Sequence, residues 1–199
     1  MSRLVVIPEH EPRGRSLSTA DARSIASALA PWGVRFERWL PTSSASDDPR
    51  TAYATQVEQL CAEGYGTIDV VRVAPDTADP GWPDKARAMR AKFRDDHTHA
   101  EDEVRFFAEG TGVFYLRLGG SVHCVCCEAG DLLSVPAGTL HWFDMGEVPR
   151  FTAIRFFRNA DGWVGNFSAD PIAASFPSLD ELAAEAAREG DRAATRASA

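Results

Sequence analysis

Residues 96–107 read DHTHAEDEVRFF and place two histidines two positions apart, with a glutamate four positions further on. On a β-strand, side chains at i and i+2 point to the same face, so His97 and His99 would project together. Glu103 keeps the same parity if the segment stays extended. Two imidazoles and a carboxylate are costly to bury, and a divalent cation would offset that cost by coordination. The alternative is a solvated polar loop between a helix and a strand.

A second motif follows about 40 residues later, in the stretch GDLLSVPAGTLHWFD at 130–144. It fits Gly-x5-Pro-x-Gly-x2-His and ends at His141, while the first stretch fits His-x-His-x3-Glu-x6-Gly and ends at Gly110. The two patterns, in this order, resemble the two sequence motifs of the cupin barrels. Ala91 and Met145 depart from the general pattern, but neither is at a ligand position. The resemblance implies one metal site with four ligands: His97, His99, Glu103 and His141.

The segment from Val104 onward has the pattern of an antiparallel β unit. Its β segments, separated by glycine-containing turns, indicate a sandwich or barrel; they are VRFFAEGTGVFYLRL, SVHCVCCEAGDLLSVPAG, LHWFDMG and RFTAIRFF. Together with the motifs, this predicts a mainly β fold with peripheral helices (α+β). The expected architecture is a cupin-type antiparallel β-barrel, also called a double-stranded β-helix or jelly roll.

The remaining segments predict how the chain is organised. Residues 1 to about 92 alternate strand and helix patterns, with strands expected in RLVVI, VRFERWL and TIDVVRVAP. Helices are expected after Ser18 or Thr19, at about Arg50 to Ala62, and in WPDKARAMRAKF. We therefore expect one cupin-type domain over 1–178, with an α/β elaboration at about 1–92 and the barrel motifs at about 93–167. In 179–199 we expect a helix and then a mobile tail, because DRAATRASA has little apolar content.

Length and charge exclude several classes of protein. The chain has 199 residues, 44% of them hydrophobic, which suits one folded domain. Its formal net charge of −8 is unfavourable for binding phosphate backbones, so a nucleic-acid partner is not expected. The N-terminal apolar run is far shorter than a secretory signal, and no segment has the ~20 apolar residues of a membrane span. We expect a cytoplasmic protein that does not bind membranes.

The stretch HCVCC at 123–127 could be taken for a second metal cluster. On an alternating strand, Cys124 and Cys126 face one way while His123 and Cys127 face the other, so the four cannot converge on one ion without a turn. A core strand with small apolar thiols is the preferred interpretation. With Cys61, these cysteines do not form a disulfide framework, which agrees with a reducing compartment.

Longer stretches resemble one cupin family in particular. The segments HTHAEDEVRFFAEGTGVFYLR, VPAGTLHWFDMG and FTAIRFF, with GWV and the earlier LAPWGVRFERW, are similar to the bacterial acireductone dioxygenases over about residues 4–167. The resemblance implies one Fe(II) or Ni(II) per chain, a monomer, and two small-molecule substrates, O2 and the acireductone 1,2-dihydroxy-3-oxo-5-(methylthio)pent-1-ene. It implies formate and 4-methylthio-2-oxobutanoate as the Fe(II) products in methionine salvage. With Ni(II) it implies formate, carbon monoxide and 3-methylthiopropanoate.

Two arginines are candidates for catalysis, since a divalent metal with one carboxylate ligand and a dianionic substrate would leave one excess negative charge. Arg105 follows Glu103 by two positions and would point to the ligand side of an extended strand. Arg155 lies among bulky apolar residues in FTAIRFF. For each, an ordinary exposed arginine is the alternative. An apolar wall around the methylthio group is expected from Phe93, Phe106, Phe143 and Trp163, although each could simply pack in the core.

Two other functions remain open at this level. Cupin barrels host many activities, so the chain could be another metalloenzyme, such as an isomerase or a different dioxygenase. A sugar-phosphate isomerase would need more basic residues around its pocket than a charge of −8 suggests. The chain could also be a cupin that binds a metal or small ligand without turnover.

Overall fold

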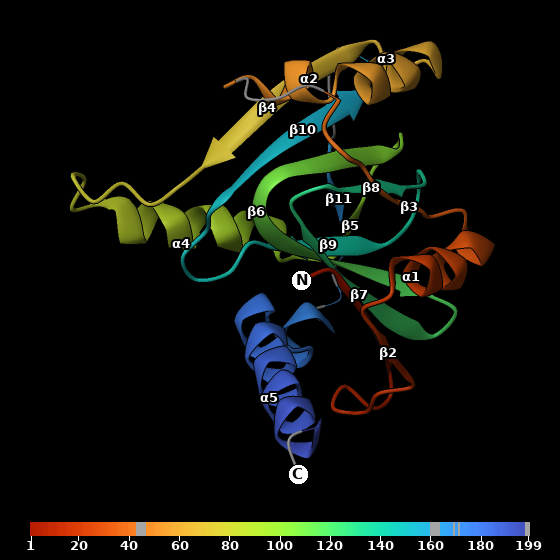
Figure 1. Ribbon diagram of the computed structural model, residues 1–199, viewed down its shortest axis with the longest axis vertical. Helices are drawn as coiled ribbons and strands as arrows, with labels where there is room; N and C mark the ends of the chain where they lie inside the picture. The colour runs from red at the N-terminus through yellow and green to blue at the C-terminus, as the bar shows by residue number, and fades with distance from the viewer. Residues whose placement is uncertain (43–46, 160–163, 169, 171, 198–199) are drawn as a thin grey trace.

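Two antiparallel sheets that share one bent strand form the centre of the structure (Figure 1). The computed structural model describes residues 1–42, 47–159, 164–168, 170 and 172–197. Its strands are β1 (Arg3–Pro8), β2 (Leu17–Thr19), β3 (Arg35–Arg38), β4 (Thr67–Val73), β5 (His97–Thr98), β6 (Glu103–Leu118), β7 (Ser121–Glu128), β8 (Asp131–Val135), β9 (His141–Asp144), β10 (Phe151–Phe157) and β11 (Asn166–Phe167). Its helices are α1 (Ala22–Leu29), α2 (Pro49–Ala52), α3 (Ala54–Ala62), α4 (Trp82–Phe93) and α5 (Leu179–Ala197), with 3₁₀ turns η1 (Ala30–Trp32) and η2 (Ile172–Ser175).

The strand shared by the sheets is β6. Its first part pairs with β8 and β10, and its second part pairs with β7 and β9. Between the two parts lies Gly110, with a φ of 73°, and a Cβ atom there would collide with the backbone carbonyl of Arg150. A glycine is needed at such a close approach. One sheet therefore runs β11-β5-β9-β6-β7-β1-β2, and the other holds β4, β10, β8 and β3 beside β6.

Apolar side chains fill the space between the sheets and cover their outer faces. In β1, Leu4 and Val6 belong to the cluster between the sheets, whereas Val5 and Ile7 belong to a second cluster that includes residues of η2 and α5. A third cluster joins the β4-containing sheet to α3. The unbroken apolar run in β1 is explained by this arrangement, since a strand covered on both faces needs no polar alternation.

The structure confirms the mainly β fold with peripheral helices. The strands expected in RLVVI, VRFERWL and TIDVVRVAP are β1, β3 and β4. The single helix expected at about Arg50 to Ala62 is wrong, because α2 ends at Ala52 and α3 begins at Ala54. Tyr53 interrupts the helix with φ −117° and ψ 31°, and its ring packs 4.4 Å from that of Phe106.

The predicted start of the first helix is also wrong. Ser18 and Thr19 belong to β2, which pairs with β1, and the helix begins at Ala22. Asp21 is its N-cap, and the carboxylate accepts a hydrogen bond of 2.8 Å from the backbone N–H of Ser24. Aspartate is a favoured cap because it satisfies an N–H group that has no partner within the helix.

The last helix is longer than the sequence predicted. Helix α5 continues through Gly190 to Ala197, where the pattern had indicated a tail. A glycine in a helix costs only about 1 kcal/mol relative to alanine, and the sequence on both sides of Gly190 contains several alanines and arginines, which favour a helix. Mobility at its end stays a prediction. Within the described ranges, none of the helices combines the length and apolarity needed to cross a bilayer.

Candidate metal centre and substrate pocket

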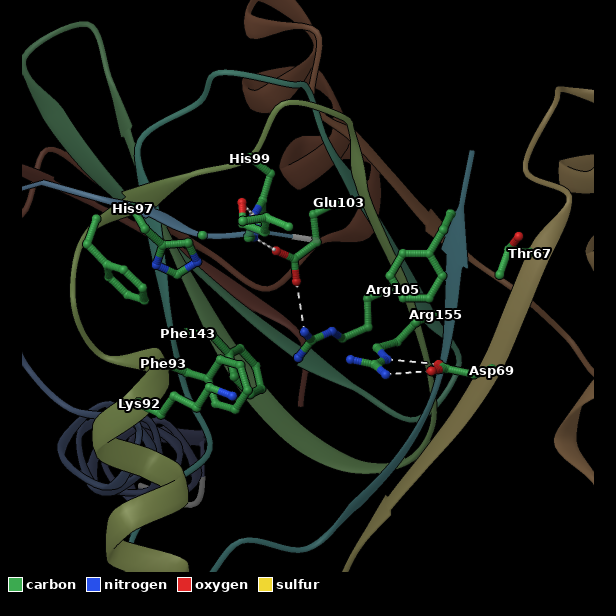
Figure 2. Close-up of a pocket in the computed structure, with 14 residues that line it drawn as sticks. Thr67, Asp69, Lys92, Phe93, His97, His99, Glu103, Arg105, Phe143 and Arg155 are labelled. Carbon is green, nitrogen blue, oxygen red and sulfur yellow. Dashed lines mark hydrogen bonds and ion pairs between the residues drawn. The ribbon is translucent and has the colours of Figure 1, made fainter. Parts of the chain in front are cut away.

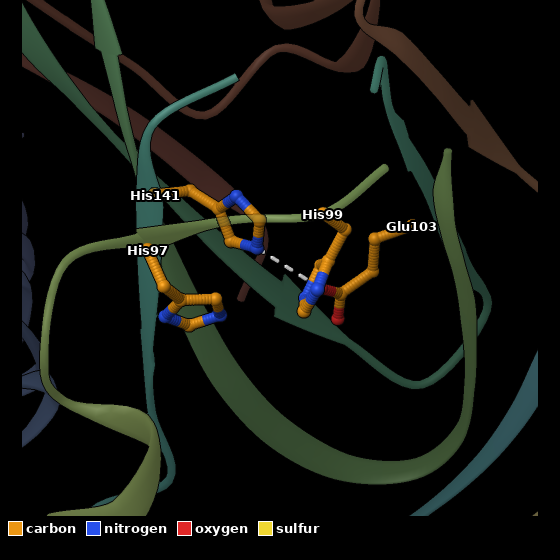
Figure 3. A group of neighbouring side chains, drawn as sticks. All are labelled: His97, His99, Glu103 and His141. Atoms are coloured by element: carbon orange, nitrogen blue, oxygen red, sulfur yellow. Dashed lines mark hydrogen bonds and ion pairs between the residues drawn. The ribbon is translucent and has the colours of Figure 1, made fainter. Parts of the chain in front are cut away.

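Four buried side chains converge where β5, β6 and β9 meet (Figure 3). His97 lies in β5 directly opposite His141 in β9, and Glu103 is the first residue of β6. His99 follows the end of β5. One ligand atom from each residue lies within 4.8 Å of the others. The strand parity expected from the sequence explains only part of this, because β5 ends at Thr98 and a turn carries the chain to Glu103.

Backbone carbonyls orient the three imidazoles. Each Nδ1 lies within hydrogen-bond distance of a carbonyl oxygen: 2.6 Å from Asp95 for His97, 3.0 Å from Val164 for His99, and 2.8 Å from Thr139 for His141. A carbonyl only accepts, so the Nδ1 atoms carry the protons in these contacts. Each neutral ring is then left with an Nε2 lone pair, the state in which histidine coordinates a metal.

Glu103 supplies the negative charge of the cluster. Its carboxylate lies 3.0 Å from His141 Nε2, 3.1 Å from His99 Nε2 and 2.8 Å from Arg105 Nη2. Burial opposes ionisation, but the cationic Arg105 guanidinium holds the pKa of Glu103 well below its usual range. For His97, in contrast, burial is what lowers the pKa. At neutral pH, the group therefore offers a carboxylate and a neutral imidazole to a cation.

Two carboxylates outside the ligand group hold the turn between His99 and Glu103 in place. Asp102 accepts hydrogen bonds from the Tyr65 hydroxyl at 2.8 Å and from the backbone N–H of Ala137 at 3.1 Å. Glu101 accepts from the backbone N–H of Arg158 at 3.1 Å. These contacts join the turn to the ends of β8 and β10. Asp102 and Glu101 therefore stabilise the position of the turn without being ligands themselves.

A pocket of about 630 Å³ opens beside the cluster (Figure 2). Three of the four ligands line it, His97, His99 and Glu103. Its aromatic wall consists of Phe93, Phe143, Phe157 and Phe167, and its charged groups are Asp69, Lys92, Arg105 and Arg155. An apolar wall beside a few charged groups is the usual composition of a small-molecule site.

Both predicted arginines lie at the pocket. The Arg105 side chain is only 8% exposed, and its guanidinium carbon lies 4.6 Å from the centre of the Phe143 ring. Burial lowers the pKa of Arg105, Glu103 opposes this change, and the nearby Arg155 adds to it. Arg155 is directly opposite Arg105 across the β6–β10 pair, and it binds the carboxylate of Asp69.

The predicted aromatic residues are only partly at the pocket. Phe93 and Phe143 line it. Phe106 does not, because it lies on the opposite face of β6, where its ring stacks on Trp39 at 4.6 Å. Trp163 is outside the described residues. Asp69 and Lys92 were missed; the one signal for Asp69 was a carboxylate inside the apolar strand TIDVVRV.

Comparisons with known proteins bear on the identity of this site. A family model described as the ARD/ARD′ family matches residues 35–165. Acireductone dioxygenase 2 of Nocardia farcinica is 54% identical over 187 residues, which cover 92% of this chain and 98% of that protein. The chain belongs to the acireductone dioxygenase family. A second member, from Saccharopolyspora erythraea, is 48% identical and covers 92% of this chain and 99% of its own.

A solved structure of an acireductone dioxygenase agrees with this assignment. The enzyme from Bacillus anthracis, described with a cadmium ion in its active centre, has a TM-score of 0.68 and 26% sequence identity. The match covers 84% of this chain and 98% of that one. The cupin-type fold and the family resemblance predicted from the motifs are thereby confirmed.

The four convergent residues of this acireductone dioxygenase family member fit a first-row divalent metal. Three imidazoles and one carboxylate suit iron, nickel, cobalt or manganese. Burial strengthens the fit, since these groups would be costly to bury without a cation. Among the described residues, the group of side chains close enough to hold a metal includes none from β7, the strand that contains HCVCC. Cys124 and Cys127 instead lie in two different apolar clusters, as the strand interpretation predicted.

Proposed function

We propose that this chain is a metal-dependent dioxygenase that cleaves the acireductone 1,2-dihydroxy-3-oxo-5-(methylthio)pent-1-ene with O2 in methionine salvage. The observation that supports this most directly is the buried group of ligand atoms, all within 4.8 Å of one another, beside a pocket in a member of this family. His97, His99, Glu103 and His141 would hold one Fe(II) or Ni(II) ion.

The bound metal supplies Lewis acidity and a fixed site for the substrate's oxygen atoms. The protein side chains supply orientation and charge. Glu103 compensates one of the two positive charges of the metal, so a dianionic acireductone leaves one excess negative charge in the site. Arg105 and Arg155 face the same pocket and would stabilise that charge. We assign both arginines to substrate binding and catalysis.

The pocket wall would hold the other end of the substrate. Phe93 and Phe143 form an apolar surface beside Arg105, suited to a methylthio group. Their rings also limit the entry of water to the charged end of the pocket, where screening would weaken the arginine contacts. With Fe(II), the products would be formate and 4-methylthio-2-oxobutanoate. With Ni(II), they would be formate, carbon monoxide and 3-methylthiopropanoate.

The proposal is tested by mixing metal-loaded protein and acireductone without oxygen, then adding O2. We expect faster loss of the enediol absorbance, oxygen uptake, and products that differ between Fe(II) and Ni(II) protein. The function is wrong if neither the absorbance nor the oxygen consumption changes faster than without protein. Size-exclusion chromatography with light scattering tests the proposal that the enzyme is a monomer, and fractionation of cells tests its cytoplasmic location.

A matched pair of histidine variants tests the metal site separately. His141→Ala should bind little metal and lose turnover, because it removes one of four ligands. His123→Ala changes another buried histidine, which lies against Trp32 outside the group, with ring centres 6.3 Å apart. It should keep its metal content. A non-catalytic cupin would show the same difference in metal content but no turnover in any form.

A further inference from the structure

Asp69 lies at the pocket edge on β4 and binds Arg155 through both of its carboxylate oxygens (Figure 2). Oδ1 accepts a hydrogen bond of 2.8 Å from Nε, and Oδ2 accepts one of 2.5 Å from Nη2. A two-point contact of this kind fixes the plane and direction of a guanidinium group, which a single contact does not. Asp69 therefore sets the direction of the Arg155 guanidinium, which also lies 5.3 Å from the centre of the Phe157 ring.

Asp69 is the end of a row of charges across three strands. Asp69 on β4 is directly opposite Arg155 on β10, and Arg155 is directly opposite Arg105 on β6. Glu103 binds Arg105 at the far end of the row. Two like charges directly opposite each other are destabilising. Each arginine is paired with a carboxylate: Arg155 with Asp69 on the neighbouring strand, and Arg105 with Glu103 on its own strand.

The two arginines differ in how easily they could move. Arg105 is enclosed, with its guanidinium carbon 4.6 Å and 5.1 Å from the Phe143 and Phe114 ring centres. The Arg155 side chain is 29% exposed and lies beside an open pocket. Without Asp69, the Phe157 ring would remain in contact with Arg155, but the two hydrogen bonds that direct the guanidinium toward Arg105 would be lost.

We propose that Asp69 is a positioning residue for the acireductone: it holds the Arg155 guanidinium beside Arg105, so that the two cations meet the same anionic substrate. This inference rests on the proposed function. It predicts that neutralising Asp69 changes substrate affinity in the direction opposite to the one expected from the charge of Asp69 alone. If Asp69 acted only through its own negative charge at the pocket edge, neutralising it would strengthen dianion binding. If it acts through Arg155, neutralising it weakens binding.

If Asp69 only supported the fold, its replacement would lower the stability of the protein. β4 is held to β10 along seven register positions, from Thr67 to Val73. The Asp69 side chain is 46% exposed, and ion pairs with that much exposure add little to stability. Asp69→Asn should therefore remain folded with its metal content unchanged, so its kinetics can be measured directly.

The kinetic test uses Asp69→Asn, Asp69→Glu, Arg155→Gln and the double variant Asp69→Asn/Arg155→Gln. We expect Asp69→Asn to raise the KM for acireductone about tenfold with kcat changed less than about twofold, the loss typical of one charged contact. Asp69→Glu should restore part of the affinity. In the Arg155→Gln background, Asp69→Asn should add nothing. A lower or unchanged KM, or an equal effect in that background, overturns the proposal.

A second measurement decides the positioning step without substrate. In ¹⁵N spectra, the Arg155 Nε–H signal is identified by its loss in Arg155→Gln, and we expect slow exchange with water in the wild type. Asp69→Asn should accelerate that exchange; an unchanged rate overturns the proposal. If the wild type shows no turnover, the proposed function fails while this result still stands. Asp79→Asn is the control, since it makes the same charge change at a pair with Lys85 outside the residues that line the pocket.

Discussion

Replacing Arg105 with methionine should separate two roles of this side chain, because Arg105 both compensates the buried Glu103 and faces the pocket. The two side chains are 8% and 4% exposed, and the N–O distance is 2.8 Å. In metal-free protein, the variant leaves a buried carboxylate without its cation, which costs about 3–5 kcal/mol. For a chain of this size, that lowers Tm by about 6–20 °C, at about 2–4 °C per kcal/mol.

The metal-loaded protein should respond differently. A divalent cation bound to Glu103 compensates the same charge, so the loss of Arg105 should cost the loaded protein only about 1 kcal/mol, the scale of an ordinary substitution. The difference of about 2–4 kcal/mol is a gain in metal affinity of about 30- to 1000-fold. Arg105→Met should thus bind Ni(II) more tightly while its KM for acireductone rises.

Urea denaturation with and without Ni(II) measures the stability of the loaded and the metal-free protein. Competition of the folded protein with a metal chelator measures the change in metal affinity. Both should be done at about pH 8, because Glu103 without Arg105 takes up a proton more readily. Arg50→Met, which removes an arginine from an exposed pair with Asp48, is the control and should change neither quantity. A metal affinity that falls together with the stability would refute the reasoning.

Three further outcomes follow from groups away from the ligands. Burial raises the pKa of Asp144, but Arg90 and two backbone amides outweigh it and lower the pKa. Its stabilisation is therefore complete above about pH 4 and is lost as the pH falls; Asp144→Asn should be less stable at pH 6 and lose less stability by pH 2.5 in thermal unfolding. Phe106→Ala should lower the free energy of unfolding by about 3–5 kcal/mol in urea, with KM little changed because the ring faces away from the pocket. Cys61 is exposed, whereas burial raises the pKa of Cys126 to about 12 and the other two thiols are buried. A thiol reagent at pH 8 should therefore modify one cysteine rapidly in the folded protein and all four after unfolding.

The sequence contained enough information for the ligands but not for their surroundings. His97, His99, Glu103 and His141 occupy spacings that a metal site requires, and their convergence follows once β5 pairs with β9. Asp69 could not be assigned, because its role depends on the register between β4 and β10, which residues far apart in the chain determine.

The misplaced aromatic residue has a different cause. Phe106 was expected in the apolar wall of the pocket, but it follows Arg105 directly, and strand parity puts neighbouring residues on opposite faces. The same rule that correctly placed Arg105 with Glu103 places Phe106 away from them, against Trp39. Strand alternation alone therefore predicts that Phe106 lies away from the pocket.

The bend in β6 shows why one motif residue that binds nothing still matters for the chemistry. Before the bend, β6 carries Glu103 and Arg105 and pairs with β10, which brings Arg155 to the pocket. After the bend, it pairs with β9 and sets the position of His141 through the register with Leu116. Gly110 lies between, at a φ of 73° and with no space for a Cβ atom. A side chain there would shift the two halves of β6 relative to each other, and with them the carboxylate and the last imidazole, without touching either ligand.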